Sequence, residues 1–386
     1  MKELFSLVIK LFAMLSNLTL CYVLILLPAA DLKAHLTSLD RLSFSQPLTI
    51  RWVYESDETV NLTPAFNDAS VYLPLAGGAV ISLQVDSGQL MWRADIGGEF
   101  SAAPVADTEG VYVASVLALS TNKTNPVQAT GTLRALGVTS GVTRWMRTLK
   151  FPLRGALAVN SQSVFGGSAD GRVYSVNKQT GVIEWASQYT APFFSTPVLS
   201  GNNIYVGNEK GTLIVLDQKT GQIKRRYQTR GAIRGAVAVI GSRIYFGSAD
   251  GYVYAYDETK GQLMWRRRTG AGVQSIIISN NGIIAASLDN FVYFFEAHRG
   301  DLQWKRQLPG RISSQPIQDG ENVLFAPLAG DACIVLSLRN GKQMNMLPIG
   351  EGNNTAATPI VAGELLLITT RAGLVAFAPT VAGRKT

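Results

Sequence analysis

The stretch Ser195–Arg225, which reads STPVLSGNNIYVGNEKGTLIVLDQKTGQIKR, contains one clear copy of the unit that builds most of this chain. Residues 195–199, 203–207 and 212–217 are short, largely apolar runs separated by turn residues. Short apolar runs bounded by turn residues predict β-strands. A fourth strand is predicted after the turn at Thr220-Gly221, so the stretch indicates a four-stranded antiparallel sheet.

The same order of strands recurs with a period near 40 residues. Residues 153–185 and 233–265 are two further clear copies, each with an Asp-Gly pair between its second and third strands. An Asp-Gly pair supplies the positive φ angles of a two-residue hairpin, so we predict tight hairpins there. Arg225 and Asn345 stand where the period predicts a tryptophan. All six tryptophans keep to this period: Trp52, Trp92, Trp145, Trp185, Trp265 and Trp304.

A period of this length made of short strands is typical of a β-propeller, in which each copy is one blade. The fragment around Trp52 is a lone fourth strand, whereas Ala357–Phe377 contains three strands without a fourth. Each fragment completes the other, and the copies then sum to eight. We therefore predict an all-β, eight-bladed β-propeller of four-stranded antiparallel blades over residues 48–380, closed by its N-terminal strand.

The first 30 residues carry an export signal. Lys2 and Lys10 precede the run Leu11–Leu27, which contains no charged residue. Positive charge before an apolar run keeps the N-terminus in the cytoplasm and exports the remainder. The run is long enough to span a bilayer, so residues 1–30 are predicted to be a membrane anchor, with a cleaved signal peptide as the alternative. The large Leu20 before Cys21 disfavours lipoprotein processing.

The remaining boundaries follow from these two assignments. Residues 31–47 are predicted to be a linker and residues 381–386 a tail, and residues 117–132 enlarge the second blade with a loop rich in Thr and Asn. The product is expected on the periplasmic face, membrane-anchored or soluble after signal cleavage. Two cysteines give no disulfide framework, and Cys333, in an apolar run, is expected to be a packed core thiol.

The phrase Ser175–Trp185, SVNKQTGVIEW, follows the pattern Ser-x4-Ser/Thr-Gly-x3-Trp, and Ala255–Trp265 is a second copy. This phrase resembles the tryptophan-docking motif of the pyrroloquinoline-quinone-repeat, or quinoprotein-like, β-propellers. In that family the indole wedges between adjacent blades. The resemblance implies a structural docking role for all six tryptophans, and a flat, rigid ring suits the space between two sheets.

Within this group the chain is most similar to the BamB family, propellers of the outer-membrane β-barrel assembly machinery. Phe151-Pro152-Leu153-Arg154-Gly155 resembles the Leu-x-Leu-Arg-Gly segment through which that family contacts the barrel-forming core subunit. The resemblance implies a partner-binding role for Phe151, Leu153 and Arg154. Two features of the family are missing: an acidic pair near Pro192-Phe193-Phe194 and the lipoprotein cysteine.

Arginines supply two further candidate binding features. Arg234 occupies the same position at the start of a first strand as Arg154, and we expect both at the mouth of the central channel, where they would bind a partner. A basic cluster comprises residues 224–226, Arg230 and residues 266–268, on outer strands of neighbouring blades. With a net charge of +8, the chain is expected to meet anionic lipid or an acidic protein surface there.

No catalytic, metal or cofactor site is predicted. His35 and His298 have no spaced ligand partner, and no carboxylate cluster suits Ca²⁺. The quinoprotein dehydrogenases of the family resemble one another in a disulfide between adjacent cysteines, a pair that this chain lacks. We predict a non-catalytic scaffold that binds envelope proteins, a barrel-assembly core subunit among them, and the membrane through its N-terminal segment, but no nucleic acid. The alternatives are a quinone-binding or degenerate dehydrogenase-like propeller and an extracytoplasmic sensor or adhesion module.

Overall fold

The computed structural model describes residues 42–117, 130–235, 237–279 and 282–380, and every regular element in these ranges is a β-strand. The described part of the chain contains no helix long and apolar enough to cross a bilayer. The predicted anchor, linker start and C-terminal tail, and the centre of the enlarged second blade, lie outside the described residues. The all-β fold class predicted from the sequence is confirmed for the described ranges.

The described strands form six four-stranded sheets and one eight-stranded sheet. The first sheet contains β2 (Ala65–Phe66), β3 (Ser70–Pro74), β4 (Ala79–Gln84) and β5 (Leu90–Asp95). The eight-stranded sheet contains β6 (Glu99–Ala106), β7 (Val111–Leu117), β8 (Thr130–Leu136), β9 (Thr143–Leu149), β10 (Leu153–Val159), β11 (Ser163–Ser168), β12 (Arg172–Asn177) and β13 (Ile183–Gln188).

Five further sheets complete residues 43–380, which form one unit. Two of them are β14 (Val198–Ser200), β15 (Asn203–Gly207), β16 (Thr212–Asp217), β17 (Ile223–Gln228) and β18 (Ala238–Ile240), β19 (Arg243–Gly247), β20 (Tyr252–Asp257), β21 (Gln262–Arg268). The next two are β22 (Val273–Ser279), β23 (Gly282–Ser287), β24 (Phe291–Glu296), β25 (Leu302–Gln307) and β26 (Ile317–Asp319), β27 (Asn322–Phe325), β28 (Ala332–Ser337), β29 (Gln343–Pro348). The last is β30 (Ile360–Ala362), β31 (Leu365–Thr370), β32 (Gly373–Pro379) and β1 (Leu48–Glu55).

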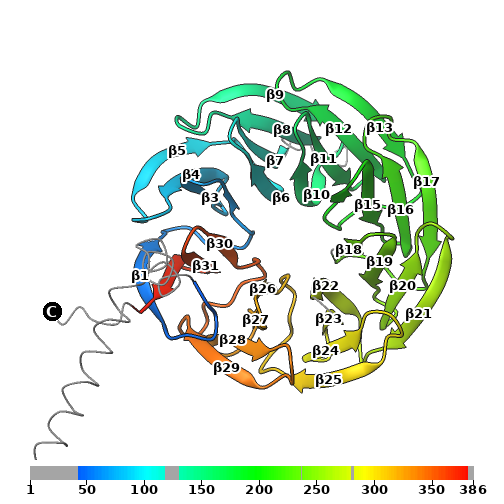
Figure 1. Cartoon of the computed structure of the whole chain (residues 1–386). Helices are drawn as coiled ribbons and strands as arrows, with labels where there is room; N and C mark the ends of the chain where they lie inside the picture. Colours follow the sequence, from blue (N-terminus) through cyan, green and yellow to red (C-terminus); the bar gives the residue numbers. More distant parts are fainter. Residues whose placement is uncertain (1–41, 118–129, 236, 280–281, 381–386) are drawn as a thin grey trace, which may run out of the picture. The chain divides into compact units, whose positions relative to one another are not determined.

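The sheets form a ring in the order of the chain, each with its first strand innermost and its fourth at the rim (Figure 1). This is the arrangement of a β-propeller. The last sheet takes its outer strand from the N-terminal side, because β1 pairs antiparallel with β32 from Leu48 with Pro379 to Glu55 with Gly373. The predicted pairing between the two ends of the repeat region is confirmed.

The eight-stranded sheet consists of two antiparallel sets, β6–β9 and β10–β13. They are joined at their inner strands by a parallel pairing of Ala103 in β6 with Ala156 in β10. Both residues are alanines, so the two backbones can approach each other closely at the centre of the ring.

Two local predictions were wrong. The first strand of the repeat at 195–225 begins at Val198 rather than at Ser195, and the first strand of the following repeat likewise begins at Ala238. The Asp-Gly turns are not two-residue hairpins, since the last ladder pair before Asp170-Gly171 is Gly167 with Val173. Of that Asp-Gly pair only Gly171 has a positive φ, and the Asp170 carboxylate instead accepts the N–H of Arg172 at 3.1 Å.

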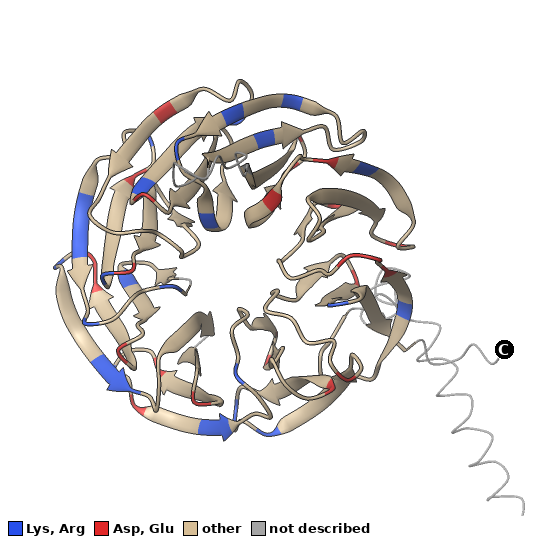
Figure 2. Cartoon of the chain, turned by 180° about the vertical axis from the view of Figure 1, so that it is seen from behind, with Lys and Arg blue, Asp and Glu red and all other residues tan. Residues whose placement is uncertain are grey.

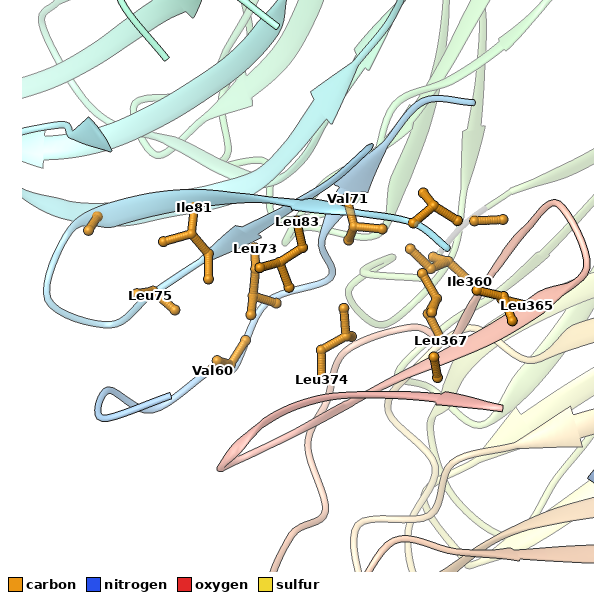
Figure 3. Packing of buried hydrophobic residues seen from close by; sticks show 14 residues of the cluster. Val60, Val71, Leu73, Leu75, Ile81, Leu83, Ile360, Leu365, Leu367 and Leu374 are labelled. Atoms are coloured by element: carbon orange, nitrogen blue, oxygen red, sulfur yellow. The ribbon is translucent and has the colours of Figure 1, made fainter. Parts of the chain in front are cut away.

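The core lies between neighbouring sheets. One cluster joins Leu73 and Ile81 of the first sheet to Leu367 and Leu374 of the closing sheet, all 1% exposed or less (Figure 3). Each such side chain contributes about 1.5–3 kcal/mol through burial, so the clusters hold the sheets in sequence around the ring. Cys333 is fully buried in β28, and this burial raises the pKa of its thiol to about 12, in agreement with the expected core thiol.

Candidate partner-binding face

The indoles tie each sheet to the next. In every case the indole N–H donates a hydrogen bond to a backbone carbonyl of the next set of four strands around the ring, which for Trp145 is β10–β13 of the same eight-stranded sheet. The pairs and their N···O distances are Trp52 with Val85 (2.9 Å), Trp92 with Val138 (2.9 Å), Trp145 with Lys178 (2.9 Å), Trp185 with Gln218 (3.0 Å), Trp265 with Ala297 (3.0 Å) and Trp304 with Leu338 (2.7 Å).

Each indole also covers a glycine of that next set of four strands. Gly221 has φ +68°, and a Cβ atom on it would lie 2.5 Å from the Trp185 ring, so no side chain fits there. The same contact joins Gly88 to Trp52, Gly141 to Trp92, Gly181 to Trp145, Gly300 to Trp265 and Gly341 to Trp304. These contacts support the docking role that the resemblance implied for the six tryptophans.

Two sheets use another residue at the tryptophan position. The Arg225 guanidinium lies against Gly261 and donates to the carbonyl of Thr259 at 3.0 Å. The Asn345 amide donates to the carbonyls of Phe44 (3.1 Å) and Gln46 (2.8 Å), just before β1. The ring therefore closes through side-chain contacts at this junction as well as through the β1–β32 ladder.

A second set of inter-sheet contacts was missed by the sequence analysis. Two residues after a tryptophan, the Nε of an arginine donates to the carbonyl of the same docking glycine. The pairs are Arg147 with Gly181 (2.7 Å), Arg267 with Gly300 (2.7 Å) and Arg306 with Gly341 (2.8 Å). The Trp-x-Arg spacing, which places both side chains on one face of a strand, is the signal that would have predicted them.

These contacts correct the predicted basic cluster. Arg225 and Arg267 point toward the following sheet and bond its backbone, so they are not free to meet an outside surface. Lys224 pairs with Asp217 at 2.9 Å. Arg226, Arg230, Arg266 and Arg268 remain exposed.

The two arginines predicted to bind a partner lie in different surroundings. Arg234 lines a cavity of about 220 Å³ formed by the innermost segments of the sheets, and Gly155 and Ala156, which follow Arg154, line it too. Arg234 binds Glu209 in a bidentate ion pair, with Nε 2.8 Å from Oε1. The Arg154 Nε is buried and has no hydrogen-bond partner among the described residues.

The other two predicted binding residues are also unlike each other. Leu153 is 1% exposed and packs with Leu149 and Leu157, so its side chain offers no surface to a partner. Phe151 is half-buried, and the ammonium of Lys150 lies 5.8 Å from its ring centre. Of the Phe151–Gly155 segment, Phe151, Arg154 and Gly155 are therefore the partly accessible residues.

The segment at Pro192-Phe193-Phe194 completes this region. Gly155 has φ +72°, and a Cβ atom on it would lie 2.6 Å from the carbonyl oxygen of Phe194, so the two segments are in direct contact. The N–H of Glu209 donates to the carbonyl of Pro192 at 3.0 Å. Phe194 is 39% exposed. The structure thus gathers Arg154, Gly155, Phe194, Glu209 and Arg234 into what we call the channel-mouth patch.

Phe194 and Glu209 were not among the predicted binding residues. The sequence lacks the acidic pair that the resemblance places near Pro192. In the structure Glu209, in the turn after β15, bonds to Pro192 through its N–H and to Arg234 through its carboxylate. Only contacts between sheets reveal this. In the described ranges, no group of three His, Cys, Asp or Glu residues is placed to hold a metal ion.

The family comparison covers this patch. The family model described as outer membrane protein assembly factor BamB matches residues 129–236 and 227–386, more than half of the chain. The chain belongs to the BamB family. A search of curated protein sequences finds no match.

Solved structures similar to this BamB-family chain share its fold. The crystal structure of BamB from Moraxella catarrhalis has a TM-score of 0.72 at 16% identity, over 88% of this chain and 100% of that one. The computationally designed Ika8 protein has a TM-score of 0.73 at 16% identity, over 86% and 99%. Quinohemoprotein alcohol dehydrogenase from Comamonas testosteroni has a TM-score of 0.70 at 12% identity, over 88% and 78%.

Proposed function

We propose that this chain is a non-catalytic scaffold of the cell envelope that docks envelope proteins through its channel-mouth patch. Counting each half of the eight-stranded sheet as a blade, the scaffold is an eight-bladed propeller. Membership of the BamB family supports an assembly role on the periplasmic face. A barrel-assembly core subunit is the proposed partner.

The chemistry of the channel-mouth patch carries the proposal. Arginine and aromatic side chains held on a rigid frame are the residues that most often dominate binding at interfaces. Arg234 is oriented by its ion pair with Glu209, and Phe194, whose backbone contacts Gly155, is 39% exposed. Arg154 is partly exposed and forms no ion pair among the described residues, so its guanidinium can donate to a carbonyl or carboxylate of a partner.

The N-terminal segment sets the proposed location. Residues 1–30 serve as anchor or cleaved signal and residues 31–47 as linker, so that the propeller at 48–380 works outside the cytoplasm. The lack of a charged residue in Leu11–Leu27 supports this division.

A quinone-binding propeller is the second candidate, because the fold is shared with quinohemoprotein alcohol dehydrogenase. The cavity at the centre argues against it on size. Its volume of about 220 Å³ lies below the range of roughly 300–1,000 Å³ typical of pockets for small organic ligands.

The docking proposal is tested on the full chain in its own membranes. Arg154→Ala with Arg234→Ala should lose the partners that wild type retains after mild crosslinking and purification. The matched control is Lys219→Ala with Arg339→Ala, two exposed cations in turns before outer strands. If the channel-mouth double variant keeps every partner, the assignment is wrong. Saturable uptake of pyrroloquinoline quinone with Ca²⁺ would favour the second candidate instead.

A further inference from the structure

Three consecutive outer strands carry a cation at the same register position, away from the channel-mouth patch. Arg226 in β17 lies opposite Ile214, Arg266 in β21 opposite Tyr254, and Lys305 in β25 opposite Tyr293. Each cation directly follows the residue of its strand that covers a glycine of the next sheet, which is Arg225, Trp265 or Trp304. In the other outer strands this position is held by Val53, Arg93, Met146, Ala186 and Met346, and Arg93 is paired with Glu58.

The three cations are exposed and uncompensated. Among the described residues none of them forms an ion pair. Their strands, IKRRYQ, QLMWRRR and LQWKRQ, contain no acidic residue. The Arg266 guanidinium and the Lys305 ammonium each lie 5.2 Å from the centre of an aromatic ring of the third strand. Figure 2 shows Lys and Arg on consecutive outer strands of the ring.

Exposed aliphatic side chains accompany the cations on the same face of each strand. Ile223, Leu263 and Leu302 are 41%, 45% and 50% exposed. Their ladder partners are Leu216, Tyr256 and Phe295, each two residues from the partner of the cation, so both side chains point the same way. We call these six residues, with Arg268, the basic rim.

A groove continues the basic rim onto the next sheet. It has a volume of about 600 Å³ and lies between β25 and β29. Arg306 and Lys342 line it, together with the apolar Leu308 and Leu336. Cationic and aliphatic groups thus occur together along this part of the ring's edge.

We propose that the basic rim rests on the surface of an anionic phospholipid bilayer. Cations beside exposed aliphatic side chains match a surface of charged headgroups over acyl chains. A flat anionic surface requires neither a pocket nor convergent hydrogen-bond donors, and the three cations share a register rather than a pocket. The apolar run Leu11–Leu27 would keep the ring close to a bilayer and so raise the local concentration of headgroups.

The test uses the full chain reconstituted in vesicles, with Cys21→Ser and a fluorescent probe on Gln307→Cys, beside Lys305. The control probe is on Met146→Cys, the equivalent of the cation position in β9. In vesicles with 30% phosphatidylglycerol, quenching of the Gln307 probe by neutral acrylamide should fall at least twofold relative to pure phosphatidylcholine. High salt, or the triple change Arg226→Gln, Arg266→Gln and Lys305→Gln, should abolish the difference.

Each other outcome overturns the proposal. Equal quenching in the two lipids, or equal protection of the Met146 probe, rules out a lipid contact through the basic rim. Protection by an acidic polypeptide such as polyglutamate without any effect of lipid would identify an acidic protein as the partner. The urea midpoint of the triple variant checks its folding, and Arg154→Ala with Arg234→Ala should leave the lipid effect intact, which separates this proposal from partner docking.

Discussion

The guanidinium of Arg225 covers Gly261 at the position where six other outer strands place an indole over a glycine. A Cβ atom on Gly261 would collide with this guanidinium, and the φ of Gly261, +66°, matches that of the glycines under the indoles. The junction between the β14–β17 and β18–β21 sheets therefore keeps the geometry of the other junctions with a smaller apolar contact.

Arg225→Trp is expected to raise the free energy of unfolding by about 1 kcal/mol, because an indole buries more apolar area over Gly261. Arg225→Ala should lower it by about 1 kcal/mol through loss of the bond to Thr259. Urea unfolding measures both. Arg226→Ala, at the exposed neighbour, is the control and should change it by less than about 0.5 kcal/mol. Identical midpoints for all variants would contradict this view of the junction.

The glycines under the indoles should be far less replaceable than other glycines in turns. Gly201 and Gly221 both have positive φ, but a Cβ atom on Gly201 meets nothing within 4 Å, whereas one on Gly221 meets the Trp185 ring at 2.5 Å. Gly201→Ala should destabilise by about 1 kcal/mol from backbone strain alone. Gly221→Ala should destabilise by at least about 2 kcal/mol more, since the ring must move. If thermal unfolding shows the same loss of stability for Gly201→Ala and Gly221→Ala, the Trp185 indole moves aside without cost.

Much of the fold was predictable because its signals are local. The spacing from Gly181 to Trp185 lies within one hairpin, and the lone strand at Trp52 needed a partner that only the last repeat lacked. The predicted turn geometry at Asp170-Gly171 was wrong. Asp170 does not adopt a positive φ there, and its carboxylate instead accepts a hydrogen bond from the backbone N–H of Arg172.

The candidate site was less predictable because it depends on contacts between sheets. Arg154 and Arg234 are equivalent in sequence, yet only Arg234 has a described ion-pair partner, Glu209, which comes from another sheet. Leu153 belongs to the segment that resembles a binding motif, but it enters the core at the start of β10. Nothing within 151–155 distinguishes a side chain that faces the core from one that faces solvent.

An ion pair between the β6–β9 and β10–β13 sets should make the stability of their junction sensitive to acid. The buried ammonium of Lys178 lies 2.8 Å from Asp107 and 3.0 Å from Glu109. Burial alone would raise the pKa of Asp107, but the bonds from Lys178 and from two backbone N–H groups outweigh it and hold the pKa below its ordinary value of 3.8. The resulting stabilisation is complete above that ordinary value and is lost as the pH falls through the lowered pKa.

Lys178→Met should therefore lower the free energy of unfolding by about 2 kcal/mol at pH 7, because it leaves Asp107 without its counter-ion. The difference in free energy of unfolding between wild type and variant should become smaller as the pH falls below about 4. Urea unfolding at pH 7 and pH 3 provides the measurement. Lys219→Met, at an exposed lysine in the equivalent turn of the next sheet, is the control. If this difference in free energy of unfolding is the same at both pH values, the ion pair with Asp107 does not cause the destabilisation.

Cys333 should be chemically silent in the folded protein. Its side chain is fully buried, and this burial raises the thiol pKa to about 12, so almost no thiolate exists near neutral pH. In a Cys21→Ser background, a thiol reagent should react with Cys333 only after unfolding in urea. Rapid reaction in native buffer would contradict the packing of β28.

Closure of the ring should be the point at which a short truncation has the largest effect. A chain that begins at residue 42 keeps β1 and the carbonyls of Phe44 and Gln46 that accept hydrogen bonds from Asn345. A chain that begins at residue 57 loses these two acceptors, the whole β1–β32 ladder and the hydrogen bond from Trp52 to Val85. We expect the second truncation to lower the free energy of unfolding by at least about 3 kcal/mol and the first to lower it by less than about 1 kcal/mol. The free edge of β32 should also pair with other chains, so dimers are expected in gel filtration of the shorter protein only. Equal urea midpoints for the two truncations would mean that β1 merely covers a ring already held together by its remaining junctions.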